Sequence, residues 1–293
     1  MRKKPLNRFK RQNRVGWSFL SIWTIGFLVF TMWPIFTSFY YSMSHVVLDG
    51  SGIQVTFVWF DNYKQVFSSA EGFSFLQSVS DFAIEILFKV PIITVFAIII
   101  AVMLNQPLKG RSLFRAIYFL PVIIASGPVI NQLVYQGAAT IPIVEQMGII
   151  SFIESTFTET LARPIANIFS ELIVILWFSG VQILLFIAAL QKIDRSTYEA
   201  AMIDGAGPWE SFWKITIPAL KSMVLVSIIF TIINLATFSE NPAILHIKNN
   251  MFALETGFGF SSAIAWLYFI ALAILLGLST LLFGTFTRER GRR

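Results

Sequence analysis

The sequence predicts an all-α membrane protein with six transmembrane helices and both termini in the cytoplasm. Three observations lead to this prediction: the composition, six long apolar runs and the placement of the basic residues. Of the 293 residues, 56% are hydrophobic and 13% are charged, and the mean hydropathy is +0.71. Soluble domains carry about 25% charged residues, so this composition indicates an integral membrane protein.

The apolar runs are long enough to cross a membrane, because a spanning helix needs about 20 mostly apolar residues. We place the six runs at 17–41, 79–104, 114–136, 165–190, 220–239 and 263–286. The second run begins with polar residues, so we expect its membrane core at 84–104. The first run has no small-residue cleavage site and is predicted to be a retained span rather than a signal peptide.

Lys and Arg residues are distributed unequally between the two sides. The N-terminal segment holds seven, 105–115 three, 191–221 four and 287–293 four, which is 18 in all. The alternate connections hold one each, Lys64, Arg163 and Lys248. Cytoplasmic loops are the basic ones, so both termini and the segment 191–221 are predicted to be cytoplasmic.

Several functional classes are disfavoured by what the sequence lacks. It has no Cys, and its only histidines, His45 and His246, lie far apart, so we expect no metal site and no catalytic residues. The net charge of +6 is concentrated beside apolar runs, which indicates membrane topology rather than nucleic-acid binding.

The chain divides by these features into four parts. We expect a basic cytoplasmic tail at 1–16, a first span with an external loop at 17–76, a transmembrane core at 77–287 and a cytoplasmic tail at 288–293. A short amphipathic helix is expected in the external loop around Tyr63–Phe67.

The cytoplasmic segment 196–220, STYEAAMIDGAGPWESFWKITIPAL, differs from its apolar surroundings. Ser196 and Glu199 match a capping box, which predicts a short helix at about 197–204. Gly205 fits a left-handed helix end, and Pro208 fits the first turn of a second short helix. Pro218 marks the beginning of the fifth span. The segment is either a well-capped connector or a rigid elbow presented to a cytoplasmic partner, and we favour the elbow.

Three motifs in this sequence resemble those of ABC importer permeases. Glu199-Ala200-Ala201, Gly205 and Ile215-Thr-Ile-Pro218 resemble the EAA loop of that family, with Ile217 in place of the usual Leu. WFDNYKQVF at 59–67 is similar to the Asn-Tyr motif of sugar permeases, and LNQPLKGRSLFRAIYFLP at 104–121 to their Gly-Arg-x-x-Phe-Arg segment. The closest group is the carbohydrate-uptake type that includes maltose, lactose and glycerol-phosphate permeases.

The resemblance implies a type I ABC importer transmembrane fold and a set of partners. These are a second homologous permease, two ATP-binding subunits, an external solute-binding protein, membrane lipid and an oligosaccharide or related polyol. The helix of the EAA loop would be the coupling helix, seated in a cleft of an ATP-binding subunit. The coupling residues implied are Glu199, Ala200, Ala201, Asp204, Gly205, Ala206 and Gly207.

The chain has no Gly-x-x-x-x-Gly-Lys-Ser/Thr phosphate loop. We therefore expect a transport subunit rather than an enzyme, with no cofactor of its own. ATP and Mg²⁺ would be used by the partner subunits.

Ionisable residues within spans are functional candidates, because burying them in a membrane is costly. Glu85 and Lys89 are spaced as an i,i+4 pair with the acid first, the favourable order. They form either a self-neutralised pair facing the helix bundle or a polar lining that contacts the solute. Glu171 lies near the outer end of the fourth span.

The resemblance also implies a solute site near the middle of the membrane, on the spans that flank the coupling loop. The polar and aromatic residues there are Trp177, Ser179, Gln182, Thr231 and Asn234. Each could contact sugar, and each could instead hold helices together. The segment after the fifth span, NLATFSENPAIL, lacks the Gly-Gly-Pro usual in disaccharide permeases, so the outer gate is expected to differ.

The sequence thus predicts a permease subunit of a bacterial importer in the cytoplasmic membrane. An importer of a non-sugar solute remains an alternative. A further alternative is an ion-coupled secondary transporter in which Glu85, Lys89 and Glu171 carry protons.

Overall fold

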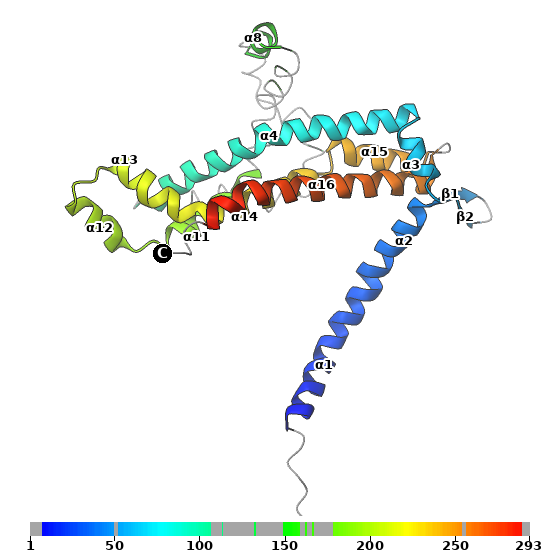
Figure 1. The fold of residues 1–293 in the computed structure, drawn as a ribbon, viewed down its shortest axis with the longest axis horizontal. Helices are drawn as coiled ribbons and strands as arrows, with labels where there is room; N and C mark the ends of the chain where they lie inside the picture. Colours follow the sequence, from blue (N-terminus) through cyan, green and yellow to red (C-terminus); the bar gives the residue numbers. More distant parts are fainter. Residues whose placement is uncertain are drawn as a thin grey trace, which may run out of the picture. The chain divides into compact units, whose positions relative to one another are not determined.

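The computed structural model describes residues 8–49, 52–106, 113, 132, 149–158, 162, 166, 178–253 and 256–288. Figure 1 labels its elements, which are α1 (Arg8–Phe27), η1 (Leu28–Met32), α2 (Trp33–Ser42), β1 (Ser44–Asp49), β2 (Gly52–Phe57), α3 (Asp61–Val66), α4 (Ala70–Asn105), α8 (Ile149–Thr156), α11 (Gly180–Leu190), α12 (Arg195–Ile203), α13 (Pro208–Ser211), η2 (Phe212–Thr216), α14 (Ile217–Ala236), α15 (Pro242–Met251) and α16 (Gly257–Arg288). Contacts divide the chain into two compact units. Unit 1 is Met1–Phe75 with His246–Leu267, and unit 2 is Leu76–Leu245 with Tyr268–Arg293.

Within the described residues, four helical stretches are long and apolar enough to cross a membrane. They are Gly16–Ser42, Ala70–Asn105, Pro208–Ala236 and Gly257–Gly284, and they match the first, second, fifth and sixth predicted spans. The third predicted span, 114–136, lies almost wholly outside the described residues. The fourth is described only in part, as the short apolar helix Gly180–Leu190. The count of six spans and the cytoplasmic termini therefore stay predictions.

Two of these stretches contain a π-helical turn directly before a proline. Pro34 follows η1, where the Trp33 N–H bonds to the Leu28 carbonyl, and Pro218 follows η2, where the Ile217 N–H bonds to Phe212. A proline inside a helix cannot donate a backbone hydrogen bond and its ring clashes with the preceding turn. A wider turn accommodates the ring without ending the helix, so each stretch continues as one helix.

Unit 1 contains a β-hairpin, which corrects the all-α prediction. β1 and β2 pair antiparallel, with Ser44 opposite Phe57 and Asp49 opposite Gly52. Five β-branched residues, Val46, Val47, Ile53, Val55 and Thr56, favour extended backbone here. The periodicity used to find spans does not detect strands this short. The short helix expected after the hairpin is present as α3, which begins at Asp61.

Asn62 and Tyr63 attach α3 to the end of the first span. The buried Asn62 amide donates to the carbonyl oxygens of Ser42 and Ser44, at 2.9 Å each. The Ser42 hydroxyl donates to the Phe39 carbonyl at 2.7 Å, so its one proton is used and the Tyr63 hydroxyl donates to it across 2.8 Å. These bonds give the Asn-Tyr motif a structural role: it joins helix, hairpin and α3.

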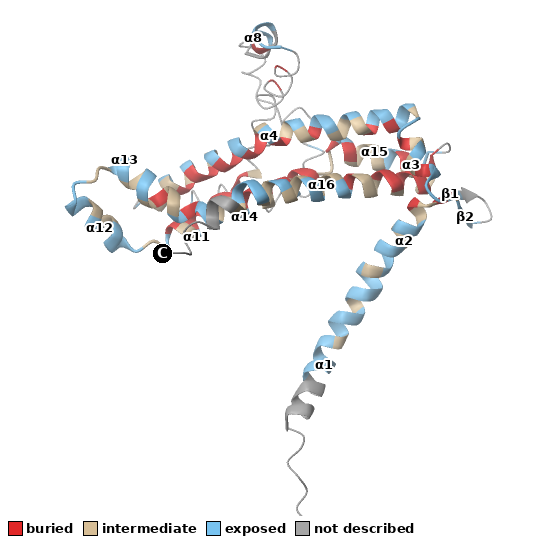
Figure 2. Cartoon of the chain, in the orientation of Figure 1, coloured by how far each residue is buried: buried red, intermediate tan, exposed pale blue. Residues whose placement is uncertain are grey.

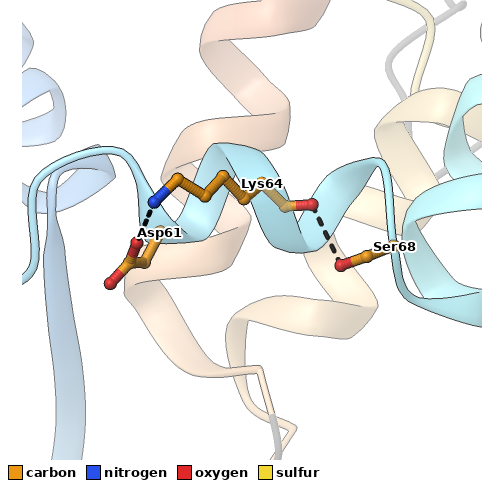
Figure 3. Close-up of polar contacts among 3 residues, drawn as sticks. All are labelled: Asp61, Lys64 and Ser68. Carbon is orange, nitrogen blue, oxygen red and sulfur yellow. Dashed lines mark hydrogen bonds and ion pairs between the residues drawn. The ribbon is translucent and has the colours of Figure 1, made fainter.

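The opposite side of α3 is polar. Lys64 pairs with Asp61 at 2.9 Å, and the Ser68 hydroxyl donates to the Lys64 carbonyl at 3.0 Å, as Figure 3 shows. Asn62 and Val66 are buried, whereas the side chains of Asp61 and Lys64 are exposed. The helix therefore has one face for packing and one for water.

The N-terminal end of α16 approaches the hairpin closely. A Cβ atom at Gly259 would overlap the Ser44 carbonyl oxygen and touch the Asn62 amide. Ser261 donates to the Ile247 carbonyl at 2.6 Å and so ties α16 to α15 within unit 1. Only glycine leaves room for this contact at position 259.

Unit 2 is built around α4, α11 and α14. One face of α4, formed by Ala97, Ala101 and Leu104, packs into a cluster with buried side chains of α11 and with Leu220 of α14. Ala97 and Ala101 are fully buried. These small residues leave room for the larger side chains of α11 and α14, so the three helices share one apolar core.

The first span has no such packing within the chain. Its side chains from Gly16 to Tyr40 are exposed or intermediate, and they include Trp23 and Phe30, which are more than 80% exposed. Figure 2 shows this contrast, with buried residues recurring along α4 and α1 mostly exposed. An apolar helix of this kind needs lipid or another protein chain around it.

Candidate functional site

The elbow, defined here as residues 194–216 (α12 with its N-cap, the turn 204–207, α13 and η2), begins two residues earlier than predicted. The N-cap of α12 is Asp194, whose carboxylate accepts from the Ser196 N–H at 3.1 Å. Ser196 therefore lies inside the helix, and the predicted capping box is wrong. Aspartate is as good an N-cap as serine, and it precedes the Ser-Thr pair. Glu199 instead pairs with Arg195 at 3.1 Å, on an exposed face.

Gly205 ends α12 in the predicted left-handed conformation, with φ of +83°. The Ala206 N–H bonds to the Ala201 carbonyl at 2.9 Å, and the Gly205 N–H bonds to Met202 at 3.1 Å. These bonds satisfy the last carbonyls of the helix, as in a Schellman motif. The turn is therefore closed by its own backbone.

Pro208 begins α13 as predicted, and Gly207 is its N-cap. The second half of the elbow is not a separate short helix, however. Residues 208–236 form one continuous helical stretch, through η2 into α14. The π turn before Pro218 makes this continuity possible, so the elbow extends directly into the fifth predicted span.

A single hydrogen bond connects the two arms of the elbow. The Tyr198 hydroxyl oxygen lies 2.8 Å from the Thr216 hydroxyl oxygen, which is buried. The two residues lie 18 positions apart, one on α12 and the other on η2. This bond holds α12 against the base of α14.

The elbow exposes several large apolar side chains. Met202, Ile203, Trp209 and Trp213 are each more than half exposed, and Ile203 is 87% exposed. Trp209 packs edge-on against Trp213. Of the implied coupling residues, Glu199, Ala200, Asp204 and Gly205 are exposed, and Ala201, Ala206 and Gly207 are partly buried. Exposed apolar side chains on a well-capped helix indicate a surface for a partner.

A second group of candidate residues lies between α11 and α14. The buried Gln182 amide donates to the Thr231 hydroxyl at 2.7 Å, and that hydroxyl donates to the Ser227 carbonyl at 2.7 Å. The structure therefore brings together Gln182 and Thr231, which the sequence had selected separately.

Three buried side-chain oxygens in the described part of the chain have no hydrogen-bond partner: Gln182 Oε1, Ser227 Oγ and Thr94 Oγ1. Leaving a buried polar group unpaired costs about 1–3 kcal/mol. Gln182 and Ser227 flank the Thr231 bond directly. A ligand with hydroxyl groups could complete these bonds.

Thr94, the third of these residues, lies on a different helix, α4. It is less than one turn from Ala97, which packs in one cluster with Ile183. Measured along its own helix at about 1.5 Å of rise per residue, each of Thr94, Gln182 and Ser227 lies some 10–15 Å from a leucine of that cluster, Leu104, Leu190 or Leu220. We call Thr94, Gln182, Ser227 and Thr231 the polar layer.

Glu85 and Lys89 form the predicted ion pair, with Nζ and Oε1 2.5 Å apart. The Lys89 side chain is 8% exposed and that of Glu85 is 21% exposed. The pairing is therefore confirmed. Whether it also contacts solute stays a prediction.

Two of the other candidate residues, Ser179 and Asn234, lie in the described part of the chain. Ser179 is buried at the start of α11, and Asn234 is partly buried on α14. Trp177 and Glu171 lie outside the described residues. The sequence reasoning missed Thr94 and Ser227, although Ser227 is one helical turn before Thr231 and could have been found by that spacing.

The segment after α14, which lacks Gly-Gly-Pro, is closed by Asn241 and Tyr268. Asn241 Oδ1 accepts from the Ala243 N–H at 2.9 Å and so caps α15. Its amide donates to the Tyr268 hydroxyl at 3.2 Å, and that hydroxyl donates to the Ala236 carbonyl at 2.8 Å. Side chains here satisfy the backbone groups that the helix break leaves free.

No family model matches the chain. Curated relatives match most of it. It is 28% identical to a probable ABC transporter permease protein, YesP, of Bacillus subtilis, over 95% of this chain and 92% of that protein. It is 29% identical to the lactose transport system permease protein LacF of Rhizobium radiobacter, over 89% of this chain and 91% of the relative. The multiple sugar-binding transport system permease protein MsmF of Streptococcus mutans is 29% identical, over 93% and 94%.

Solved structures agree in fold. A bacterial alginate ABC transporter, solved with a periplasmic protein carrying an alginate pentasaccharide, has a chain that covers 97% of this one with a TM-score of 0.65 and 15% identity. The resemblance indicated by the EAA loop is therefore confirmed: over nearly its whole length this chain is similar to the permease subunits of sugar ABC transporters.

Proposed function

We propose that this chain forms half of the translocation pathway of an ATP-driven importer for an oligosaccharide or related polyol. The observation that carries the proposal is the elbow at 194–216, whose capped turn and exposed apolar side chains suit a rigid contact with a separate motor subunit. The relatives add support, since they include permeases named for lactose, arabinooligosaccharide and trehalose/maltose transport. The chain is a transport component rather than an enzyme.

The elbow would transmit movement because it has few ways to deform. Its turn is closed by backbone bonds at Gly205 and Ala206, and its arms are joined through Tyr198 and Thr216. Its second arm is the same helical stretch as α14. A displacement of α12 by an ATP-binding subunit would therefore reach the polar layer on α14 without an intervening loop.

The polar layer would receive the solute. Its unpaired groups are two hydroxyls and an amide oxygen, and sugars offer hydroxyls that both donate and accept. The described members of this layer carry no charge, which suits a neutral polyhydroxy solute. Lys89 is already paired with Glu85 in a position nearer the start of α4. We propose two roles for that pair, support of the helix bundle and contact with the solute.

The remaining partners follow from the same proposal. The importer would contain a second homologous permease, two subunits that bind ATP and Mg²⁺, and an external protein that delivers the solute. The chain would lie in the bacterial cytoplasmic membrane with both termini in the cytoplasm and would bind no nucleic acid. The exposed first span would be covered by lipid and by the second permease.

Co-purification with ATPase activity tests this proposal. The chain is expressed with its candidate ATP-binding subunit and placed in lipid nanodiscs, and ATP hydrolysis is measured with and without binding protein and solute. Stimulation by both together is expected. Replacing Ile203 with Asp should abolish assembly, and the matched change of Phe152 to Asp, on exposed α8, should not.

Proton-driven transport by the chain alone in liposomes would overturn the proposal in favour of a secondary transporter. ATPase stimulation by a peptide or an anion, and by no glycan, would keep the importer and replace the solute class.

A further inference from the structure

We propose that the β1–β2 hairpin is an interfacial membrane anchor, held in the lipid headgroup layer at the end of the first span. The contact surface is an apolar strip formed by Tyr40, Ile53, Val55, Phe57 and Trp59. The inference requires only that the first span crosses a membrane. It goes beyond the importer proposal and does not depend on it.

The strip joins directly to the spanning helix. The Tyr40 ring, near the end of α2, stacks on Phe57 at 5.9 Å with the ring planes 18° apart. Phe57 in turn meets the Trp59 ring edge-on at 5.0 Å. Three aromatic rings from the helix, from β2 and from the segment after it therefore form one continuous surface.

The length of the first span determines the depth of this surface. Gly16–Ser42 has 27 residues, which corresponds to about 40 Å of helix. The hydrocarbon core is about 30 Å thick, and about 40–45 Å with the headgroups included. The last turns of α2 therefore lie in the headgroup layer, where Trp and Tyr are enriched.

The hairpin cannot move far from that depth, because its base is attached to the helix. Asn62 binds the carbonyls of Ser42 and Ser44, and the Val58 N–H bonds to the Met43 carbonyl at 2.9 Å. In Figure 1 the hairpin turns away from the line of α2 instead of continuing along it. This direction keeps it near the depth at which the helix ends.

The exposed strand has two different faces. Ile53, Val55 and Phe57 lie on one face of β2, and Gln54 and Thr56 lie on the other, since side chains alternate along a strand. Ile53 is 59% exposed, and Phe57 is 44% exposed. The facing strand contributes Val46, which is buried against the rest of unit 1. On this face of the hairpin, Val46 of β1 is buried, whereas the apolar side chains of β2 stay exposed. These exposed side chains form the strip.

Trp59 supplies an independent observation. It has a φ of +56°, and among the described residues it is the one non-glycine residue with a positive φ. A bulky residue in this region is strained, and the Trp59 ring is 65% exposed although it meets the Phe57 ring edge-on. Glycine or asparagine would hold this backbone at lower cost. At this position the Trp59 ring extends the aromatic strip, and a contact with the membrane would favour such a ring over glycine or asparagine.

Water, by contrast, is the expected environment of the neighbouring face of α3. The Asp61–Lys64 pair and the Ser68 hydroxyl lie there (Figure 3). Between residues 44 and 60 the sequence has no Lys, Arg or Glu, and its one acidic residue, Asp49, lies at the turn end of the hairpin, opposite Gly52. The change from an uncharged strip to a charged face within a few residues places the boundary between lipid and water at the hairpin.

Spin labels test the anchor. The chain has no Cys, so a single introduced Cys is the only labelling site on this chain, and the unsubstituted transporter measures any labelling of other subunits. Labels are placed at Ile53 and Val55 on the strip, and at Gln54 and Thr56 as matched controls. The complete transporter is placed in nanodiscs of phosphatidylethanolamine and phosphatidylglycerol, and collision with O₂ and with a water-soluble nickel chelate is compared at each site.

The anchor predicts an alternation: O₂ access exceeds nickel access at 53 and 55, and the order reverses at 54 and 56. Replacing Trp59 with Asn, which accepts a positive φ, should leave the fold intact and raise nickel access at 55. Equal nickel access at all four sites would overturn the proposal. So would protection of 53 and 55 from both reagents, whether constant or produced by adding the solute-binding protein, since either result shows a protein contact.

Discussion

The hydroxyl oxygens of Tyr198 and Thr216 lie 2.8 Å apart and join α12 to the base of α14. Thr216 is buried beside the π turn that precedes Pro218, and Tyr198 reaches it from the middle of α12. The carbonyl of Ser211 is a second, longer acceptor for Thr216, at 3.5 Å. The two arms of the elbow are thereby connected at a point away from their shared turn.

Replacing Tyr198 with Phe should weaken coupling while leaving assembly intact. The change removes one hydrogen bond, worth about 1 kcal/mol, and keeps the ring. We expect ATPase stimulation by binding protein and solute to fall about fivefold, the equivalent of that energy. Thr216→Val should have a similar effect, and the double variant should be no worse than either. Additive losses would show that the two residues act separately.

Gly205 can be tested without a steric complication, because no heavy atom lies within 4 Å of a Cβ atom built there. The whole effect of a substitution then comes from the φ of +83°. Gly205→Val should lose about 1–2 kcal/mol or more at the turn and abolish solute-stimulated ATPase activity. Gly205→Asn is the matched control, since Asn tolerates this region, and should retain most activity. Normal transport by Gly205→Val would reject the rigid elbow.

Gln182→Leu should separate a solute role from a structural one. Thr231 keeps its bond to the Ser227 carbonyl, and the unpaired Oε1 is removed. The lost bond, about 1 kcal/mol, is offset by the removal of an unpaired buried group, so the melting temperature should change little. We expect the solute concentration for half-maximal transport to rise at least about tenfold, which corresponds to 1.4 kcal/mol. A large fall in melting temperature with unchanged transport would make Gln182 a packing residue.

Breaking the Glu85–Lys89 pair should destabilise the protein. Lys89→Glu places two carboxylates together at a largely buried site, and loss of one partner of a buried pair costs about 3–5 kcal/mol. Glu85→Lys with Lys89→Glu should restore part of the melting temperature. Lys64→Gln, which breaks the exposed pair with Asp61, should change stability by less than about 1 kcal/mol. Failure of the exchange to restore stability would favour a solute role for Lys89.

Asn62→Leu should loosen unit 1. It removes both hydrogen bonds to Ser42 and Ser44 and leaves two buried acceptors unpaired. Each unpaired acceptor costs about 1–3 kcal/mol. We expect faster proteolysis within residues 44–57 and a lower melting temperature, while Gln65→Leu on the same short helix should change neither. Unchanged proteolysis would show that the hairpin does not depend on Asn62.

Local sequence signals predicted much of the fold. The first, second, fifth and sixth predicted spans all appear, because hydropathy is a property of consecutive residues, although the second and fifth helical stretches begin 9 and 12 residues before their predicted starts, at Ala70 and Pro208. Gly205 and Pro208 were found for a similar reason, since backbone conformation at a helix end depends on the residue itself. The pairing of Glu85 with Lys89 follows from i,i+4 spacing within one helix.

Local reasoning was wrong where two signals competed within a few residues. Asp194 and Ser196 are both good N-caps, and the pairing of Ser196 with Glu199 favoured the later one. The hairpin was also missed. Its strands have only six residues each and lie between helices, whose apolar patterns are much longer. Each error involves only a few residues. The first concerns where a helix begins, and the second concerns which element occupies a loop.

The sequence by itself determined that this is a membrane protein with apolar spans and a capped elbow with the EAA pattern. Only the tertiary structure decided that Tyr198 meets Thr216, that Asn62 joins the hairpin to the first span, and that Gln182 bonds to Thr231. Hydropathy and capping act between residues a few positions apart. The decisive contacts join residues 18 to 49 positions apart, and such pairs are selected by how helices pack.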